Sequence, residues 1–241
     1  MPDVMSAVPT QGRCAVVGNG RMGNALVAAS ARFVGPFDHG FDGRGYSAVV
    51  LAVPDAQIMA AGEVVLPGRL VGHCSGACGL APLRPHEAFG LHPLMTVTKS
   101  GASFAGAGAA VAGSTPQALA FARSLASELG MTAVEILDED RAAYHAAASI
   151  ASNFLITLED AAERLLSTTG ADRSILVPLV RATVENWATL GGPAALTGPI
   201  ARGDNATVAR HRGAVEARSP ELLALFDAFA ERTRALAERE V

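Results

Sequence analysis

The sequence predicts a doubly wound α/β domain followed by an all-α domain. Up to about residue 137, short β-branched runs alternate with helical stretches, which is the pattern of a parallel sheet covered by helices. Beyond that point, long Ala- and Leu-rich segments with a period of about 3.6 residues replace them. We therefore expect one domain at 1–137 and a second at 138–241.

Each element follows from its local pattern. In the first domain, apolar β-branched runs predict strands at 13–17, 32–37, 48–53, 70–73, 88–92, 109–112 and 132–137. Helices are expected at 22–31, which lacks proline, and at 116–129, which opens with Pro116 and stops at Gly130. The second domain is expected to hold helices at about 140–168, 173–190, 205–217 and 220–240.

The composition argues against several classes of function. Half of the 241 residues are apolar, and the arginines are scattered over a chain of net charge −4, so no basic footprint for nucleic acid or an anionic membrane is visible. No run is long enough for a membrane helix, and residues 1–11 lack the features of a signal peptide. The three cysteines are an odd number and suit a reducing compartment. We expect a cytoplasmic protein that acts on a small molecule.

A glycine-rich turn is the sharpest local signal. Gly18-Asn19-Gly20-Arg21-Met22-Gly23 follows the first predicted strand directly and opens a helix. In that context the first glycine permits a tight turn, the second lets the backbone approach a pyrophosphate, and the third allows close packing of helix on strand. The helix start also offers free N–H groups to phosphates. These six residues predict a Rossmann-type site for NAD or NADP; the alternative is a Rossmann-like scaffold that has lost its ligand.

The preference between the two dinucleotides stays open. Asp38 ends the second predicted strand, where an acidic side chain would hydrogen-bond a ribose 2′-hydroxyl and favour NAD. Arg21, His39 and Arg44 could instead offer charge to a 2′-phosphate, and Asp38 could be a simple turn residue. The segment 38–47 is also too short for the usual second crossover helix, so the adenosine side of the site is expected to be abbreviated.

Further candidates follow the later strands, because a doubly wound sheet presents ligands at the carboxyl ends of its strands. Val53 and Pro54 end the third strand, Ser75 follows the fourth, and His92 ends the fifth. His92 could orient a nicotinamide or a substrate oxygen, or could fix its own loop through a backbone hydrogen bond. His73, Cys74 and Cys78 do not have the spacing of a closed zinc site, so we assign them to core and loop and expect no metal.

The second domain opens with a polar stripe on an apolar helix. His145, Ser149, Asn153 and Thr157 recur at every fourth position and therefore share one helix face. The stripe predicts a site, with a satisfied structural network as the alternative.

A later loop adds two charged candidates. Arg202 could clamp a carboxylate with its planar guanidinium. Asp204 could bind substrate, but the simpler interpretation is a helix N-cap bonded near Thr207.

Taken together, these motifs closely resemble one family over essentially the whole chain. The residues that carry the resemblance are the glycine turn, His73-Cys-Ser-Gly-Ala, Leu91-His-Pro-Leu, Tyr144-His-Ala-Ala-Ala with Asn153-Phe154, and Leu196-Thr-Gly-Pro-Ile-Ala-Arg-Gly-Asp. The family joins a Rossmann-like domain to a DUF2520-type helical domain. It looks like a branch of the 6-phosphogluconate dehydrogenase, ketopantoate reductase and pyrroline-5-carboxylate reductase superfamily. The resemblance implies an NAD(P)-binding domain, a helical domain that forms homodimers, and an active site in the cleft between the domains.

One departure from the superfamily affects the expected chemistry. Related reductases carry a Lys-x-x-x-Asn pair on a helix; Asn153 matches the asparagine, but Ser149 stands at the lysine position. Lys99, the single lysine, lies on another segment. His145, one turn before Ser149, could act as the general acid or base, and His92 resembles the catalytic histidine in the His-Pro segment of prephenate dehydrogenases.

We therefore expect an NAD(P)-dependent oxidoreductase for a small carboxylate-bearing 2-oxo acid or imine, with a ketopantoate-like compound as the single best guess. In this hypothesis His145 relays the proton, Asn153 positions the reacting atom and Arg202 holds the carboxylate, while His92 and Ser75 shape the nicotinamide end of the site. The alternative is a non-catalytic dinucleotide-binding or regulatory protein, which the missing lysine favours.

Overall fold

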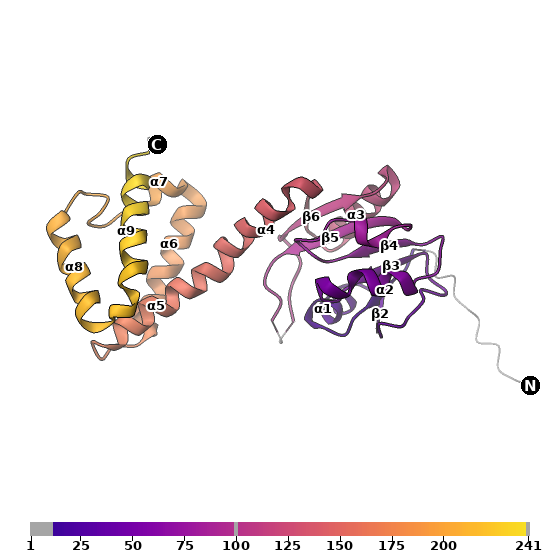
Figure 1. Ribbon diagram of the computed structural model, residues 1–241, viewed down its shortest axis with the longest axis horizontal. Helices are drawn as coiled ribbons and strands as arrows, with labels where there is room; N and C mark the ends of the chain where they lie inside the picture. Colours follow the sequence, from indigo (N-terminus) through magenta and orange to yellow (C-terminus); the bar gives the residue numbers. More distant parts are fainter. Residues whose placement is uncertain (1–11, 99–100, 240–241) are drawn as a thin grey trace, which may run out of the picture. The chain divides into compact units, whose positions relative to one another are not determined.

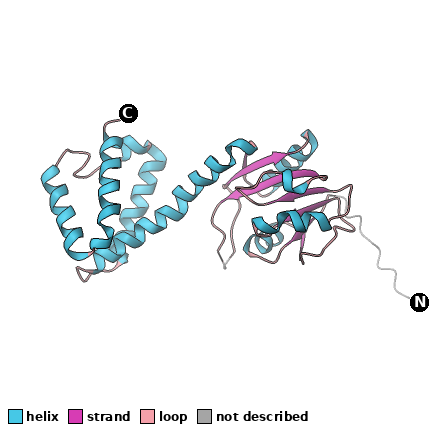
Figure 2. Ribbon diagram, in the orientation of Figure 1, coloured by secondary structure: helices cyan, strands magenta, loops and turns pink. Residues whose placement is uncertain are grey.

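The computed structural model describes residues 12–98 and 101–239. Residues 1–11 and Lys99, about which the sequence raised expectations, lie outside the described part. The chain divides into two compact units, Met1–Ser149 and Ile150–Val241. All described strands belong to the first unit, and the second unit is helical (Figure 2).

The first unit is built on one seven-stranded sheet in the order β2-β1-β3-β4-β5-β6-β7. Its strands β3, β4, β5 and β6 can be followed side by side in Figure 1. Its strands are β1 Cys14–Val17, β2 Phe33–Phe37, β3 Ala48–Leu51, β4 Leu70–His73, β5 Glu87–Leu94, β6 Gly108–Gly113 and β7 Thr132–Glu135. Because β1 lies between β2 and β3, the strand order reverses there, which confirms the predicted doubly wound Rossmann-type sheet.

One pairing differs from the expected parallel sheet. β5 and β6 are antiparallel, with His92 opposite Ala110, whereas every other neighbouring pair is parallel. A parallel pairing would need a crossover, usually a helix, but the described residues between β5 and β6 form no helix. The chain therefore returns directly alongside β5.

Helices cover both faces of this sheet. They are α1 Arg21–Ala29 and α3 Pro116–Glu128 on one face and α2 Ile58–Val64 on the other. A fourth helix, α4 Arg141–Ser149, follows β7 at the end of the unit. Alternate residues of β1 enter opposite cores: Cys14 and Val16 pack with residues of α1 and α3, whereas Ala15 and Val17 pack with residues of α2. Burial on both faces explains why the strands are almost continuously apolar.

The link between β2 and β3 has no helix, as its length predicted. Three aromatic side chains fill this place instead: the rings of Phe37 and Phe41 stack with centroids 4.0 Å apart, and Tyr46 meets both edge-on. They pack against the core on the α2 side of the sheet. The link between β2 and β3 is therefore short but well packed.

The second unit contains α5 Leu155–Ser167, α6 Leu176–Leu190, α7 Gly192–Ala195, α8 Asn205–Arg218 and α9 Leu223–Ala237. The single helix expected at 140–168 was wrong in one respect, because a π-helical turn, Ile150–Phe154, separates α4 from α5. A π turn takes one extra residue, so it changes which residues share a helix face. No described helix is long and apolar enough to span a membrane.

Candidate functional site

The three glycines of the turn have three different surroundings. A Cβ on Gly18, whose φ is +111°, would lie 2.4 Å from the carbonyl oxygen of Ala52, and a Cβ on Gly23 would lie 2.0 Å from that of Gly18. A Cβ on Gly20 would have only the Ala52 oxygen near it, at 4.0 Å. The fold itself therefore requires the first and third glycines, whereas the second borders open space.

The start of α1 is equally open. Gly20 is its N-cap, no side chain caps the helix, and its first turn holds no acidic residue. The Asn24 amide donates to the side chain of Asn19 and to the carbonyl of Gly20, both at 2.9 Å, which holds the turn together. Arg21 is exposed and Met22 is half-buried. An uncapped helix start of this kind suits an anion such as a phosphate.

Several predicted residues gather at the same edge of the sheet. The turn follows β1 at the point where the strand order reverses. Val53 and Pro54 follow β3, and Val53 lies beside Gly18. Asp38 comes directly after β2 and is exposed. This edge carries the carboxyl ends of the parallel strands, where ligands bind in such sheets.

Ser75 organises the loop that follows β4. Its hydroxyl donates to the carboxylate of Asp55 at 2.8 Å and accepts from the backbone N–H groups of Ala77 and Cys78. The side chain is only 8% exposed, and these three bonds use its donor and both acceptor positions. Ser75 thus ties the β3 and β4 ends of the sheet together.

His73 is a core residue, as predicted. It is buried, its Nδ1 accepts from the N–H of Ser75, and its Nε2 donates to the carbonyl of Gly79. Burial lowers its pKa, so the imidazole is neutral at pH 7. Cys14 and Cys74 are protonated thiols because burial raises their pKa, that of Cys74 to about 12.

Two histidines, one from β5 and one from α4, lie close together beside the loop that follows β4. The rings of His92 and His145 have centroids 6.1 Å apart, and His92 Nδ1 hydrogen-bonds the hydroxyl of Tyr144 at 2.8 Å. A Cβ on Gly76 would lie 2.8 Å from His92 and 2.9 Å from His145. Gly76 therefore provides the space in which both imidazoles converge. The alternative prediction for His92 was a hydrogen bond to the backbone that fixes its own loop. Its Nδ1 instead bonds the side chain of Tyr144.

A buried arginine lies behind this pair. Arg141, at the start of α4, is 2% exposed, and its Nε donates to Asp138 at 3.0 Å. Its Nη2 is the single buried side-chain polar atom without a partner in the described part of the chain, and it lies over Gly90 of β5. Sequence reasoning missed Arg141, Tyr144 and Gly76; the Tyr144-His145 pair within an otherwise Ala-rich segment was the available signal.

The remaining candidates lie at the end of α4 and in the second unit. Ser149 is half-buried, whereas His145, Asn153 and Thr157 are exposed in this single chain, and Asn153 belongs to the π turn. Asp204 caps α8 by accepting the N–H of Thr207 at 3.0 Å, as the simpler interpretation predicted, and this hydrogen bond lowers the pKa of its carboxyl.

Arg202 is exposed, and it forms no ion pair with any other residue that the structure describes. Its guanidinium is therefore free to meet an anion.

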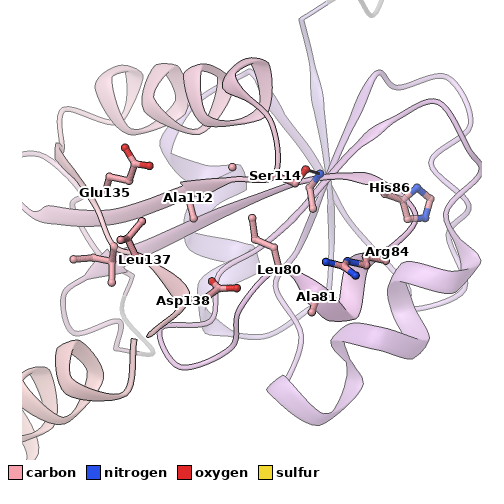
Figure 3. Close-up of a pocket in the computed structure, with 12 residues that line it drawn as sticks. Leu80, Ala81, Arg84, His86, Ala112, Ser114, Glu135, Leu137 and Asp138 are labelled. Atoms are coloured by element: carbon pink, nitrogen blue, oxygen red, sulfur yellow. Dashed lines mark hydrogen bonds between the residues drawn. The ribbon is translucent and has the colours of Figure 1, made fainter. Parts of the chain in front are cut away.

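A cavity of about 340 Å³ lies near the start of β5, away from the glycine turn. Figure 3 shows the guanidinium of Arg84 and the carboxylate of Asp138 on opposite sides of Leu80 in its wall. None of the predicted site residues lines it. Among the residues described, no group of three His, Cys, Asp or Glu side chains is placed to hold a metal ion.

Solved structures share this architecture. A Bacteroides fragilis protein with the provisional name NADP oxidoreductase has a TM-score of 0.78 at 18% identity, covering 95% of this chain and 100% of its own. A Thermotoga maritima protein has a TM-score of 0.79 at 21% identity, over 93% and 98%. Plasmodium falciparum pyrroline carboxylate reductase with NADP bound has a TM-score of 0.61 at 12% identity, over 96% and 100%.

At these identities the likeness shows the fold. No curated protein matches the chain in sequence. One family model does match it, that of the domain of unknown function DUF2520, over residues 108–233, which is more than half of the chain. The chain belongs to the DUF2520 family.

Proposed function

We propose that the protein is an NAD(P)-dependent oxidoreductase. The observation that carries the proposal is the open space at Gly20, beside an uncapped helix start at the point where the strand order reverses. The other two glycines are required by the fold, but nothing within the described chain requires the second. A pyrophosphate that approaches the backbone there does require it.

In this proposal the residues around the turn hold the dinucleotide. Backbone N–H groups of Gly20, Arg21 and Met22 would bind the pyrophosphate, and Val53, Pro54 and Ser75 would border the dinucleotide along the β3 and β4 ends. Asp38 favours a ribose with a free 2′-hydroxyl, as in NAD, whereas the exposed Arg21 could bind the 2′-phosphate of NADP. Titration with each dinucleotide separately distinguishes the two. When bound, the nicotinamide supplies or accepts the hydride.

The substrate in this proposal is a small carboxylate-bearing 2-oxo acid or imine, with a ketopantoate-like compound as the best guess. His145, exposed on α4, would relay the proton, and Asn153 would hold the reacting oxygen or nitrogen. Arg202 would bind the carboxylate, and Ser149 and Asp204 are further candidates for substrate contact. The names of related structures support this class, because one is a pyrroline carboxylate reductase with NADP bound.

We further propose that a second copy of the chain covers the helical unit. Within residues 150–239, only Val208, Val215 and Ala230 are buried apolar residues. Helices α5 and α6 expose large side chains in the single chain, among them Ile156 at 69%, Leu179 at 63% and Trp187 at 61%. Large apolar side chains exposed on two helices favour a partner, and a second copy of the chain offers the same side chains.

The dimer has a direct test. Trp187→Glu is expected to convert a dimer into a monomer in sedimentation experiments, because it places a charge in the apolar face. Met59→Glu changes a similarly exposed apolar residue of α2 and serves as the matched control. A monomeric wild-type protein would contradict the dimer.

The oxidoreductase activity is tested by the oxidation of NADH or NADPH in the presence of a panel of 2-oxo acids and cyclic imines. Turnover that His145→Ala abolishes is the expected result. Turnover that is unchanged in His145→Ala would contradict its role. Dinucleotide binding without any turnover across the panel would favour the non-catalytic alternative.

A further inference from the structure

One hydrogen bond links the two elements that carry the histidine pair. His92 projects from β5, and its Nδ1 lies 2.8 Å from the hydroxyl oxygen of Tyr144 on α4. The two rings are nearly perpendicular, with centroids 5.6 Å apart. We propose that Tyr144 is a positioning residue that holds His92 as its Nε2–H tautomer and thereby offers a neutral hydrogen-bond donor to the reacting atom of the substrate. The role toward substrate rests on the proposed function.

The direction of this hydrogen bond follows from what each group has available. In the described chain, His92 Nδ1 is the one partner of the Tyr144 hydroxyl. If the hydroxyl donates, both atoms are satisfied by a single bond. If Nδ1 donated instead, the hydroxyl proton would be left without a protein acceptor in a half-buried position. A donating Tyr144 leaves the imidazole proton on Nε2.

The surroundings keep both groups in the required protonation states. Burial is the main cause that lowers the pKa of His92 to about 4, and the nearby His145, Arg141 and His73 act in the same direction. Asp55 alone opposes them. Burial also raises the pKa of Tyr144, against the influence of Arg141. At pH 7 the pair is therefore a neutral imidazole and a protonated phenol.

The free nitrogen is accessible. Nε2 of His92 lies beside Gly76, at the position where a Cβ would approach it to 2.9 Å. It makes no hydrogen bond within the described residues, and it is not fully buried. A neutral N–H there can stabilise the negative charge that develops on a carbonyl oxygen or imine nitrogen as hydride arrives.

Nitrogen-15 NMR on the full-length protein tests the tautomer without any ligand. Two-bond proton–nitrogen correlations distinguish the two neutral tautomers, and the loss of one signal set in His92→Gln assigns His92 among the six histidines. We expect the Nε2–H form at pH 7 in the wild-type protein and a mixture of tautomers in Tyr144→Phe. Tyr46→Phe, the same change at the other tyrosine, is expected to leave the His92 signals unchanged.

An Nδ1–H tautomer in the wild-type protein, or an unchanged tautomer in Tyr144→Phe, would overturn the proposal. For a 2-oxo acid that the wild-type enzyme reduces, Tyr144→Phe is expected to lower kcat about fivefold, with no change in the Kd of the dinucleotide. An unchanged kcat would overturn the role toward substrate. Failure of the protein to bind dinucleotide would contradict the proposed function and, with it, the role of His92 toward substrate. It would leave the tautomer untouched, because the tautomer is measured without dinucleotide.

Discussion

Gly23 offers the sharpest test of the packing that forms the glycine turn. In Gly23→Ala the new Cβ would lie 2.0 Å from the carbonyl oxygen of Gly18, whereas ordinary contact begins at 3.4 Å. Because the obstacle is backbone, α1 has to move away from β1. Overpacking of this kind costs about 1–3 kcal/mol, and the alanine returns about 0.5–1 kcal/mol through helix propensity. An approach of 2.0 Å to a backbone atom belongs at the upper end of the overpacking range, about 2–3 kcal/mol, so we expect a net loss of about 1–2.5 kcal/mol in the free energy of unfolding.

The same change elsewhere separates packing from propensity. Gly213 is also helical, in α8, but a Cβ there would meet nothing within 4 Å. Urea unfolding followed by circular dichroism should show the midpoint of Gly23→Ala lowered by roughly 0.5–1 M, and that of Gly213→Ala unchanged or raised. The single tryptophan, Trp187, reports separately on the second unit. A midpoint for Gly23→Ala at or above the wild-type value would refute the reasoning.

The remaining predictions concern pH and the β4 loop. Since the pKa of His92 falls from 6.5 to about 4 on folding and that of buried His73 also falls, the unfolded chain binds more protons below pH 6.5. Stability is therefore expected to decrease as the pH falls from 6.5 toward 4, and His92→Gln should reduce this decrease in urea midpoints compared at about pH 7 and pH 5; an identical decrease in the variant would contradict the assignment to His92. Ser75→Ala removes the acceptor for two backbone N–H groups and should cost about 1–3 kcal/mol in urea unfolding. The exposed Ser124→Ala is its control, and equal stabilities of the two variants would argue against the loop-organising role.

The fold was largely predictable because its signals are local. Each strand is marked by its own apolar run, and the glycine turn at residues 18–23 directly follows the first of them. The antiparallel pairing of β5 with β6 was not predictable, because an apolar run does not encode strand direction. The helix α2 was missed because its seven residues include Gly62 and carry too short a pattern.

The site was predictable only in part, for a similar reason. Strand ends could be assigned, so Val53, Ser75 and His92 were found at the expected edge. The bond between His92 and Tyr144 joins residues 52 positions apart, and its existence depends on how α4 packs on β5. The π turn at Ile150–Phe154 inserts one residue into a helical period, which changes the face that Asn153 shares with His145. Periodicity alone cannot show such an insertion.

Calorimetric titration of the pure protein with NADH and NADPH, each alone, tests the central claim most directly. The account predicts saturable binding of one or both, lost in Gly20→Asp, which adds a negative charge at a position where a Cβ has no heavy atom closer than 4.0 Å. Binding should be retained in Gly213→Asp, where the same residue is added on α8 away from the turn. Absence of binding by the wild-type protein, or equal binding by Gly20→Asp, would contradict a dinucleotide site at this turn.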